Sequence, residues 1–169
     1  MDKKKRVILL MVPPLIWGLI IALSSSMSYG DQDIRPYLAN VGREHWIVEW
    51  FGWVRFTYGS SVVSVDYLGP YTFIEFFIRK GAHVVAFAIL SFLLYRMFKG
   101  MNLRSWVSAI VTLSVSIGFA SIDEFRQYFH LDRTGMWQDV VLDTVGAIFG
   151  VFISWMVYRK KNKRTPPYT

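Results

Sequence analysis

The chain has no cysteine and few charged residues for its length. Without thiols it can form no disulfide, no thiolate nucleophile and no zinc site built from cysteine. Charged residues make up 18% of the sequence, whereas an ordinary soluble domain carries about 25%. These absences exclude a disulfide scaffold and a thiol enzyme, and they argue against a water-soluble globular domain.

Apolar residues take the place of the missing charges, and they form four long runs. A helix needs about 20 predominantly apolar residues to cross a bilayer, and each run approaches that length. We therefore predict an all-α integral membrane protein in which four transmembrane helices form a bundle. A single domain over residues 1–169 is expected, with spans at about 7–23, 81–98, 106–122 and 140–158.

The first apolar run has two interpretations. The basic start MDKKKR, the apolar residues and the small-residue sequence Ala22-Leu23-Ser24 resemble a secretory signal with its cleavage site. The apolar part of such a signal is about 7–15 residues long, which is shorter than this run. We therefore expect a retained transmembrane helix rather than a cleaved signal.

Basic residues predict the orientation of the chain, because Lys and Arg accumulate on the cytoplasmic side of a membrane. Twelve of the 19 basic residues flank the runs on one side, together with a single acidic residue, Asp2. Both termini are therefore expected in the cytoplasm, with segments 24–80 and 123–139 facing outward. Short basic blocks beside apolar runs also indicate a membrane rather than a nucleic acid as the partner of the net charge of +7. The twelve residues are Lys3, Lys4, Lys5, Arg6, Arg96, Lys99, Arg104, Arg159, Lys160, Lys161, Lys163 and Arg164.

The outward segment 24–80, about 57 residues long, contains an unusual number of tryptophans. Trp46, Trp50 and Trp53 are spaced so that they share one face of a helix. We predict an interfacial amphipathic helix that lies in the outer headgroup layer, and a cap packed over the bundle is the alternative. The run Val62–Val65 between turn residues indicates a short β-hairpin.

Polar residues gather at the outward ends of the last three apolar runs. Residues three or four apart share a helix face, as Glu75 and Arg79 do, and as Asp139 and Asp143 do. Ionisable groups at this depth tend to face a protein interior or a watery cavity and are often functional. The predicted binding residues are Arg79, Lys80, His83, Asp123, Glu124, Gln127, Arg133, Asp139 and Asp143.

Several chemistries fit these residues. Arg and Lys can bind the phosphate of a lipid headgroup, and Glu124 or His83 could serve as a catalytic acid or base. The carboxylates together with His83 could bind a divalent cation, but no metal site is predicted, because no His-x-x-x-His or comparable ligand spacing occurs. A salt-bridge network that closes the bundle would explain the same residues without any ligand. Gly146-x-x-x-Gly150 is typical of close helix packing.

The combined motifs resemble the VanZ-like family of bacterial membrane proteins over roughly residues 70–158. The matching residues are Lys80-Gly81-Ala82-His83, Asp123-Glu124-x-x-Gln127-x-Phe129, Arg133, Asp139-Val140 and Gly146-x-x-x-Gly150. The resemblance implies a multi-pass protein of the bacterial plasma membrane, linked in the founding member to teicoplanin resistance. The chain departs from the family at Asp143, where the family usually has Asn, and near Met136, where it has a small polar residue. The first departure adds a charge.

From these features we expect the outward polar site to engage a membrane lipid or a lipid-linked cell-wall precursor, and so to affect glycopeptide susceptibility. A membrane enzyme that modifies an envelope lipid or glycan is the first alternative. A structural or accessory membrane subunit is the second. No cofactor and no oligomeric state follow from the residues alone.

Overall fold

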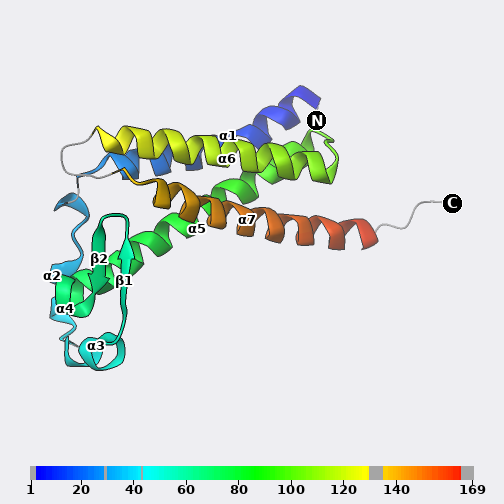
Figure 1. The fold of residues 1–169 in the computed structure, drawn as a ribbon. Helices are drawn as coiled ribbons and strands as arrows, with labels where there is room; N and C mark the ends of the chain where they lie inside the picture. The colour runs from blue at the N-terminus through cyan, green and yellow to red at the C-terminus, as the bar shows by residue number, and fades with distance from the viewer. Residues whose placement is uncertain (1–2, 29, 43, 130–134, 165–169) are drawn as a thin grey trace.

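The computed structural model describes residues 3–28, 30–42, 44–129 and 135–164, and most of them are helical. Four long helices carry a small folded region between the first and the second of them (Figure 1). The elements in chain order are α1 (Lys3–Ser26), the 3-10 helix η1 (Gly30–Gln32), α2 (Arg35–Asn40), α3 (Glu44–Phe51), β1 (Arg55–Tyr58), β2 (Ser61–Ser64), α4 (Val65–Leu68), α5 (Pro70–Gly100), α6 (Ser105–Tyr128) and α7 (Trp137–Arg164).

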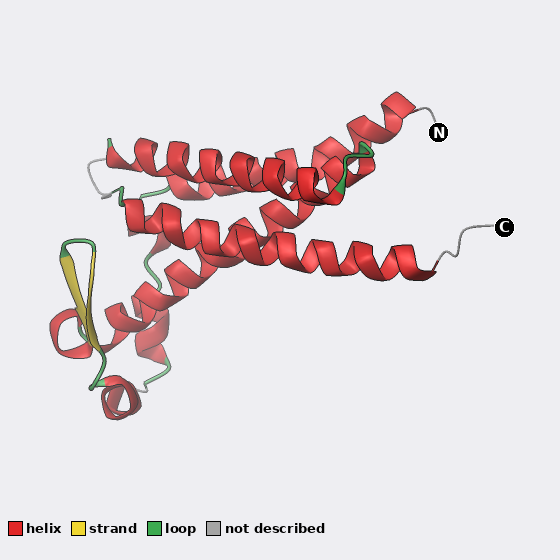
Figure 2. Cartoon of the chain, turned by 45° about the vertical axis from the view of Figure 1, so that its right-hand side comes forward, coloured by secondary structure: helices red, strands yellow, loops and turns green. Residues whose placement is uncertain are grey.

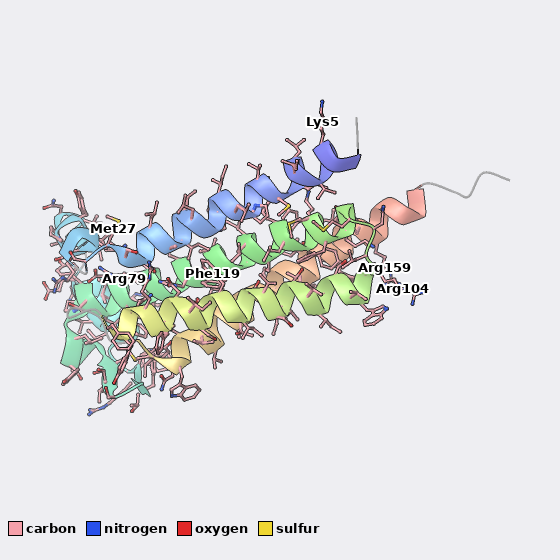
Figure 3. The ribbon with its side chains drawn as sticks, turned by 90° about the horizontal axis from the view of Figure 1, so that it is seen from above. Lys5, Met27, Arg79, Arg104, Phe119 and Arg159 are labelled. Carbon is pink, nitrogen blue, oxygen red and sulfur yellow. The ribbon has the colours of Figure 1, made fainter. Side chains whose placement is uncertain are left out.

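Four helices are long and apolar enough to cross a membrane, as the sequence predicted. Their spanning stretches are Val7–Ser26, Pro70–Gly100, Ser105–Tyr128 and Trp137–Arg159. Both ends of the chain lie at one end of the bundle, here called the termini end (Figure 1). The β-hairpin and the short helices lie at the other end, here called the hairpin end. Figure 3 shows Lys5, Arg104 and Arg159 at the termini end, and Met27 and Arg79 at the hairpin end.

Helix α5 begins at Pro70, well before the predicted span at 81–98. Gly69, with φ 78°, makes the turn that precedes the helix, and Pro70 occupies the first turn, where its missing N–H costs nothing. Glu75 is fully buried and paired with Arg79, so the helix runs through the charged residues that precede the predicted span. The segment between the first two long helices is therefore 27–69.

That segment folds around its own small core at the hairpin end. Strands β1 and β2 form the antiparallel hairpin that the valine run predicted, with Tyr58 opposite Ser61. Gly59 has φ 61°, which a two-residue hairpin turn requires at this position. The core combines Ile47 of α3, Val63, Val65 and Phe73 at the start of α5, so the region is fastened to the long helix by apolar contacts.

Helix α5 is the axis of the bundle, since it contacts all the other long helices and runs obliquely across them (Figure 2). One face buries Phe87, Leu90 and Leu94 in an apolar core that also includes Ile21 of α1 and Ala120 of α6. Helix α7 approaches the other face closely. A Cβ on Gly146 would collide with the Val84 carbonyl, so the predicted glycine motif does serve close packing here.

Helix α1 packs into the bundle as an integral element. The Trp17 indole donates to the carbonyl of Ala86 at 2.9 Å, and Ile21 is buried in the apolar core. Ser25 near its end donates to the buried Asp123 at 2.5 Å. A chain cut in the sequence Ala22-Leu23-Ser24 would lose the contacts of Trp17 and Ile21.

We therefore predict that α1 stays attached to the mature protein. The intact mass of the protein purified from membranes should include residues 1–24, and an epitope tag placed before residue 3 should remain with the rest of the chain. The replacement Trp17→Phe keeps an aromatic ring but removes the indole donor, and it should lower the melting temperature by an amount equivalent to about 1 kcal/mol. A mature chain that begins after residue 22, 23 or 24 would contradict the prediction.

Candidate functional site

Polar side chains from the hairpin, α5, α6 and α7 meet at the hairpin end of the bundle. We call this set the carboxylate cluster, because three of its six members are carboxylates. The sequence placed five of them in one site, and the structure brings those five together. Its members are Tyr58, Lys80, His83, Glu124, Asp139 and Asp143.

Asp139 is the centre of the most tightly bonded part of the cluster. Its Oδ1 atom accepts from the Lys80 ammonium at 2.5 Å and from the Tyr58 hydroxyl at 2.5 Å. Burial, followed by the hydrogen bond to Asp139, raises the pKa of Tyr58 well above its ordinary value, so this hydroxyl remains a donor. The Lys80 ammonium also lies 4.9 Å from the centre of the Tyr58 ring. The Lys80–Asp139 ion pair therefore joins α5 to α7, and the Tyr58 hydrogen bond joins the hairpin to both.

His83 and Asp143 form a second pair one turn deeper. The Nδ1 atom of His83 lies 3.6 Å from Asp143 Oδ1, which is an ion-pair distance but too long for a hydrogen bond. The His83 side chain is 30% exposed, whereas that of Asp143 is 1% exposed. Neither carboxylate oxygen of Asp143 has a hydrogen-bond partner in the described part of the chain. The imidazole of this pair is therefore partly exposed, whereas its carboxylate is fully buried.

Glu124 reaches the cluster from α6. Its Oε2 atom accepts the backbone N–H of Met136 at 3.0 Å, which fixes the start of α7 against the end of α6. The carboxylate interacts electrostatically with Lys80, Asp139 and Asp143. Gly135 makes this approach possible, because a Cβ there would collide with the Glu124 carbonyl.

Asp123 and Gln127 lie beside the cluster and form the joint between α1 and α6. Asp123 accepts from Ser25 at 2.5 Å, from Arg126 at 2.8 Å and from Gln127 at 3.0 Å. Arg126 also donates to the carbonyl of Ala22 at 2.8 Å. Asp123 therefore ties α1 to α6 through Ser25, while its bonds to Arg126 and Gln127 lie within α6.

Arg79 belongs to a third group, near the start of α5. It donates twice to the buried Glu75, at 2.9 and 3.0 Å, as their spacing of four predicted. Arg79 also donates to the Gln32 carbonyl at 2.8 Å. Arg35 lies 3.6 Å from the other carboxylate oxygen of Glu75. The hydrogen bond that Arg35 donates to Asp33 lowers the pKa of the Asp33 carboxyl to about 2. The sequence had grouped Arg79 with Lys80, but the two side chains point to different partners.

Two residues remain to be compared with the sequence prediction, Arg133 and Tyr58. Arg133 lies outside the described residues. Tyr58 was not predicted, because it enters the cluster only after the hairpin folds back onto α5 and α7. The sequence feature that could have indicated Tyr58 is Gly59, the turn residue that follows it. That turn makes Tyr58 the last residue of its strand, next to the hairpin turn.

The cluster offers more acceptors than donors. Three carboxylates face one ammonium, one imidazole and one hydroxyl, and the ammonium has three N–H bonds, of which Asp139 takes one. No group of three His, Asp or Glu side chains among the described residues is arranged to hold a metal ion. The arrangement can therefore bind a polar headgroup through mixed hydrogen bonds, or exchange protons among its acids and its imidazole.

The VanZ/LLP1 family matches the chain over residues 9–158, which is most of its length. No curated protein and no solved structure matches it.

Proposed function

Because the chain belongs to the VanZ/LLP1 family and has four helices able to cross a membrane, we propose that its carboxylate cluster binds an envelope lipid. The ligand is the headgroup of a membrane lipid or of a lipid-linked cell-wall precursor. Its capture lowers susceptibility to glycopeptides of the teicoplanin type. The single observation that carries this proposal is that the donor side chains Lys80 and His83 are partly exposed, whereas the acceptor side chains Asp139 and Asp143 are buried behind them.

The donors stand at the mouth of the cluster. Lys80 is 22% exposed and His83 is 30% exposed, while Asp139 and Asp143 lie behind them with 11% and 1%. An incoming phosphate would meet the ammonium and the imidazole first. Hydroxyl or amine groups of the same headgroup could then donate to the carboxylates. A headgroup that carries both phosphate and donor groups fits this order better than a bare phosphate.

Apolar side chains on the same helices could receive the acyl chains of such a ligand. Phe77 and Val85 of α5 and Val141 and Val145 of α7 are exposed on the helices that carry Lys80, His83, Asp139 and Asp143. In a bilayer these groups would contact hydrocarbon. A lipid could therefore keep its tails in the membrane while its headgroup reaches Lys80 and His83.

We further propose that the hairpin end faces the exterior and that both termini lie in the cytoplasm of a bacterial cell. The support is the basic bias of the termini end, where Lys5, Arg104 and Arg159 lie (Figure 3). Glycopeptides act outside the plasma membrane, so a ligand site at the hairpin end would be on the side where they act.

Helix α3 is proposed to lie in the outer headgroup layer. It packs inward through Ile47, while its residues Trp46 and Trp50 are 48% and 60% exposed. Trp53, which follows the end of the helix at Phe51, is 82% exposed. Exposed indoles at the end of a membrane bundle favour the interface between lipid and water. In this proposal one face of α3 packs on the small core through Ile47 and the other face contacts lipid.

The proposal predicts that Lys80→Met abolishes the effect on teicoplanin susceptibility. A lost charge-assisted hydrogen bond is worth about 1.5–3 kcal/mol, so headgroup affinity should fall about 10- to 100-fold. The measurements are the minimal inhibitory concentration in a sensitive host that expresses the protein, and native mass spectrometry of the purified protein for bound lipid.

Arg104→Met is the matched control, because it removes an exposed basic residue at the opposite end of the bundle. It should leave both readouts unchanged at equal expression. The proposal fails if the wild-type protein neither changes teicoplanin susceptibility nor retains a lipid on purification.

An enzyme that modifies an envelope lipid or glycan is the second candidate. The observation in its favour is that His83 lies beside an acid, since a carboxylate can orient an imidazole that acts as a base. Glu124 is the other candidate acid or base. Lipid and cell-wall profiles of Glu124→Gln that match those of the wild type would argue for binding without turnover.

A further inference from the structure

Helices α5 and α7 touch closely at two levels, and this close contact ends toward the hairpin end. A Cβ on Gly146 would collide with the Val84 carbonyl, and a Cβ on Gly150 would collide with the Ala88 carbonyl. Gly81 lies one turn before Val84 and two turns before Ala88, so it is on the same side of α5. A Cβ on Gly81, however, would meet no atom within 4 Å. The surface of α5 is therefore open at Gly81, as expected where two obliquely crossing helices move apart (Figure 2).

Gly81 and Ala82 interrupt an exposed apolar face of α5. Both residues are themselves exposed. Ile78 and Val85, which are 46% and 57% exposed, lie one turn before and one turn after them on the same face of the helix. Two large side chains thus border two residues whose side chains occupy little space. We call this place the Gly81 notch, and its residues are Ile78, Gly81, Ala82 and Val85.

Two side chains that can donate to a phosphate leave α5 beside the notch. Lys80 directly precedes Gly81, and His83 directly follows Ala82. Their side chains are 22% and 30% exposed. Asp139 takes one of the three N–H bonds of the Lys80 ammonium, which leaves the others for a ligand. A phosphate seated in the notch would lie beside the residues that carry both donors.

The charge of the carboxylate cluster limits which headgroup fits beside these donors. The cluster sets Glu124, Asp139 and Asp143 against Lys80 and His83. With its acids ionised, it therefore carries no net positive charge, whether or not the imidazole is protonated. A pyrophosphate would bring several negative charges toward these carboxylates, and like charges repel more strongly at low dielectric. A headgroup with one phosphate and one ammonium group adds no net charge, and its ammonium group is attracted to the acids.

We propose that the Gly81 notch seats the phosphate and glycerol of a glycerophospholipid whose headgroup is zwitterionic, with one phosphate and one amine. The phosphate accepts from Lys80 and His83, and the amine lies toward Asp139, whose side chain is 11% exposed. The acyl chains continue along the apolar face at Val85, toward the centre of the bilayer. This inference rests on the lipid binding proposed above, and it narrows the ligand to a phospholipid rather than a pyrophosphate-linked precursor.

Gly81→Leu tests the notch. The new side chain fills the notch, but its Cβ meets no atom of the protein within 4 Å, and leucine favours a helix more than glycine does. The melting temperature should therefore not fall. The measurement of binding is native mass spectrometry of the full chain, purified in detergent and incubated with phosphatidylethanolamine. The retained lipid should fall about tenfold, which corresponds to about 1.4 kcal/mol of binding free energy.

Gly118→Leu is the matched control, because Gly118 is also an exposed glycine of a spanning helix and a Cβ there meets no atom within 4 Å. This variant should retain as much lipid as the wild type. If Gly81→Leu does not fold, Ala82→Leu adds a large side chain to the same notch and takes its place. A folded notch variant that retains as much phosphatidylethanolamine as the wild type overturns the inference, while lipid binding by the carboxylate cluster would stand.

Competition between lipids tests the class of ligand. Phosphatidylethanolamine has a phosphate and an amine, phosphatidylglycerol has a phosphate without an amine, and an isoprenyl pyrophosphate has two linked phosphates. The wild-type protein, offered equal amounts of all three, should retain mainly phosphatidylethanolamine. A larger share of either of the other lipids overturns the zwitterionic ligand. Retention of none of the three overturns this inference together with the lipid binding on which it rests.

Discussion

Replacing Gly150 with alanine is expected to destabilise the protein more than any other single methyl group added to the bundle. The new Cβ would collide with the Ala88 carbonyl and the Ser91 hydroxyl of α5, and a backbone atom cannot move aside cheaply. Overpacking of this kind costs about 1–3 kcal/mol and sometimes more. The melting temperature in detergent, followed by tryptophan fluorescence, should fall by about 10 °C for a loss of about 3 kcal/mol.

Gly118→Ala is the control for this prediction. Gly118 lies in a helix that spans the same membrane, but a Cβ at this position meets no atom within 4 Å. Alanine favours a helix over glycine by about 0.8–1 kcal/mol, so this variant should be as stable as the wild type or slightly more stable. Equal melting temperatures for the two variants would mean that α5 and α7 do not approach as closely as described.

Arg79→Met is expected to have the second large effect, and through stability rather than through ligand binding. Glu75 is fully buried, and Arg79 makes two hydrogen bonds to it. Removing one partner of a buried ion pair costs about 3–5 kcal/mol, because the other charge remains without its counterion. Arg35, at 3.6 Å from Glu75, would offset part of this loss. The measurement is again the melting temperature, together with the yield of folded protein.

A double variant separates the two roles of Arg79. Replacing both Glu75 and Arg79 with Met removes the buried charge along with its partner, so most of the lost stability should return. If Arg79 serves only to hold the start of α5, the double variant should also regain the effect on teicoplanin susceptibility. A double variant that is stable but inactive would instead assign Arg79 a direct part in ligand binding.

The division of the predicted site into three groups has a physical cause. Spacing along the chain shows which residues share a face of one helix, and the Glu75–Arg79 pair was predictable in this way. Spacing cannot show which neighbouring helix that face meets. Lys80 follows Arg79 directly, yet a turn of about 100° per residue sends it to Asp139 of α7 instead.

The sequence by itself determined that this protein belongs in a membrane, that four of its helices can span it, and that its carboxylates gather at the end opposite the basic blocks. These follow from the free energy of moving apolar and charged groups between water and hydrocarbon, which depends on composition over about 20 residues. It also determined the glycine motif of α7 and the hairpin.

Only the tertiary structure decided that α5 starts at Pro70 and is the axis of the bundle. It alone brought Tyr58 to Asp139, and it alone assigned Asp123 to the joint with α1. These contacts join residues 81 and 98 positions apart. Contacts over such distances depend on how tilted helices cross, and crossing is set by the packing of small residues such as Gly146 and Gly150 against a neighbouring backbone.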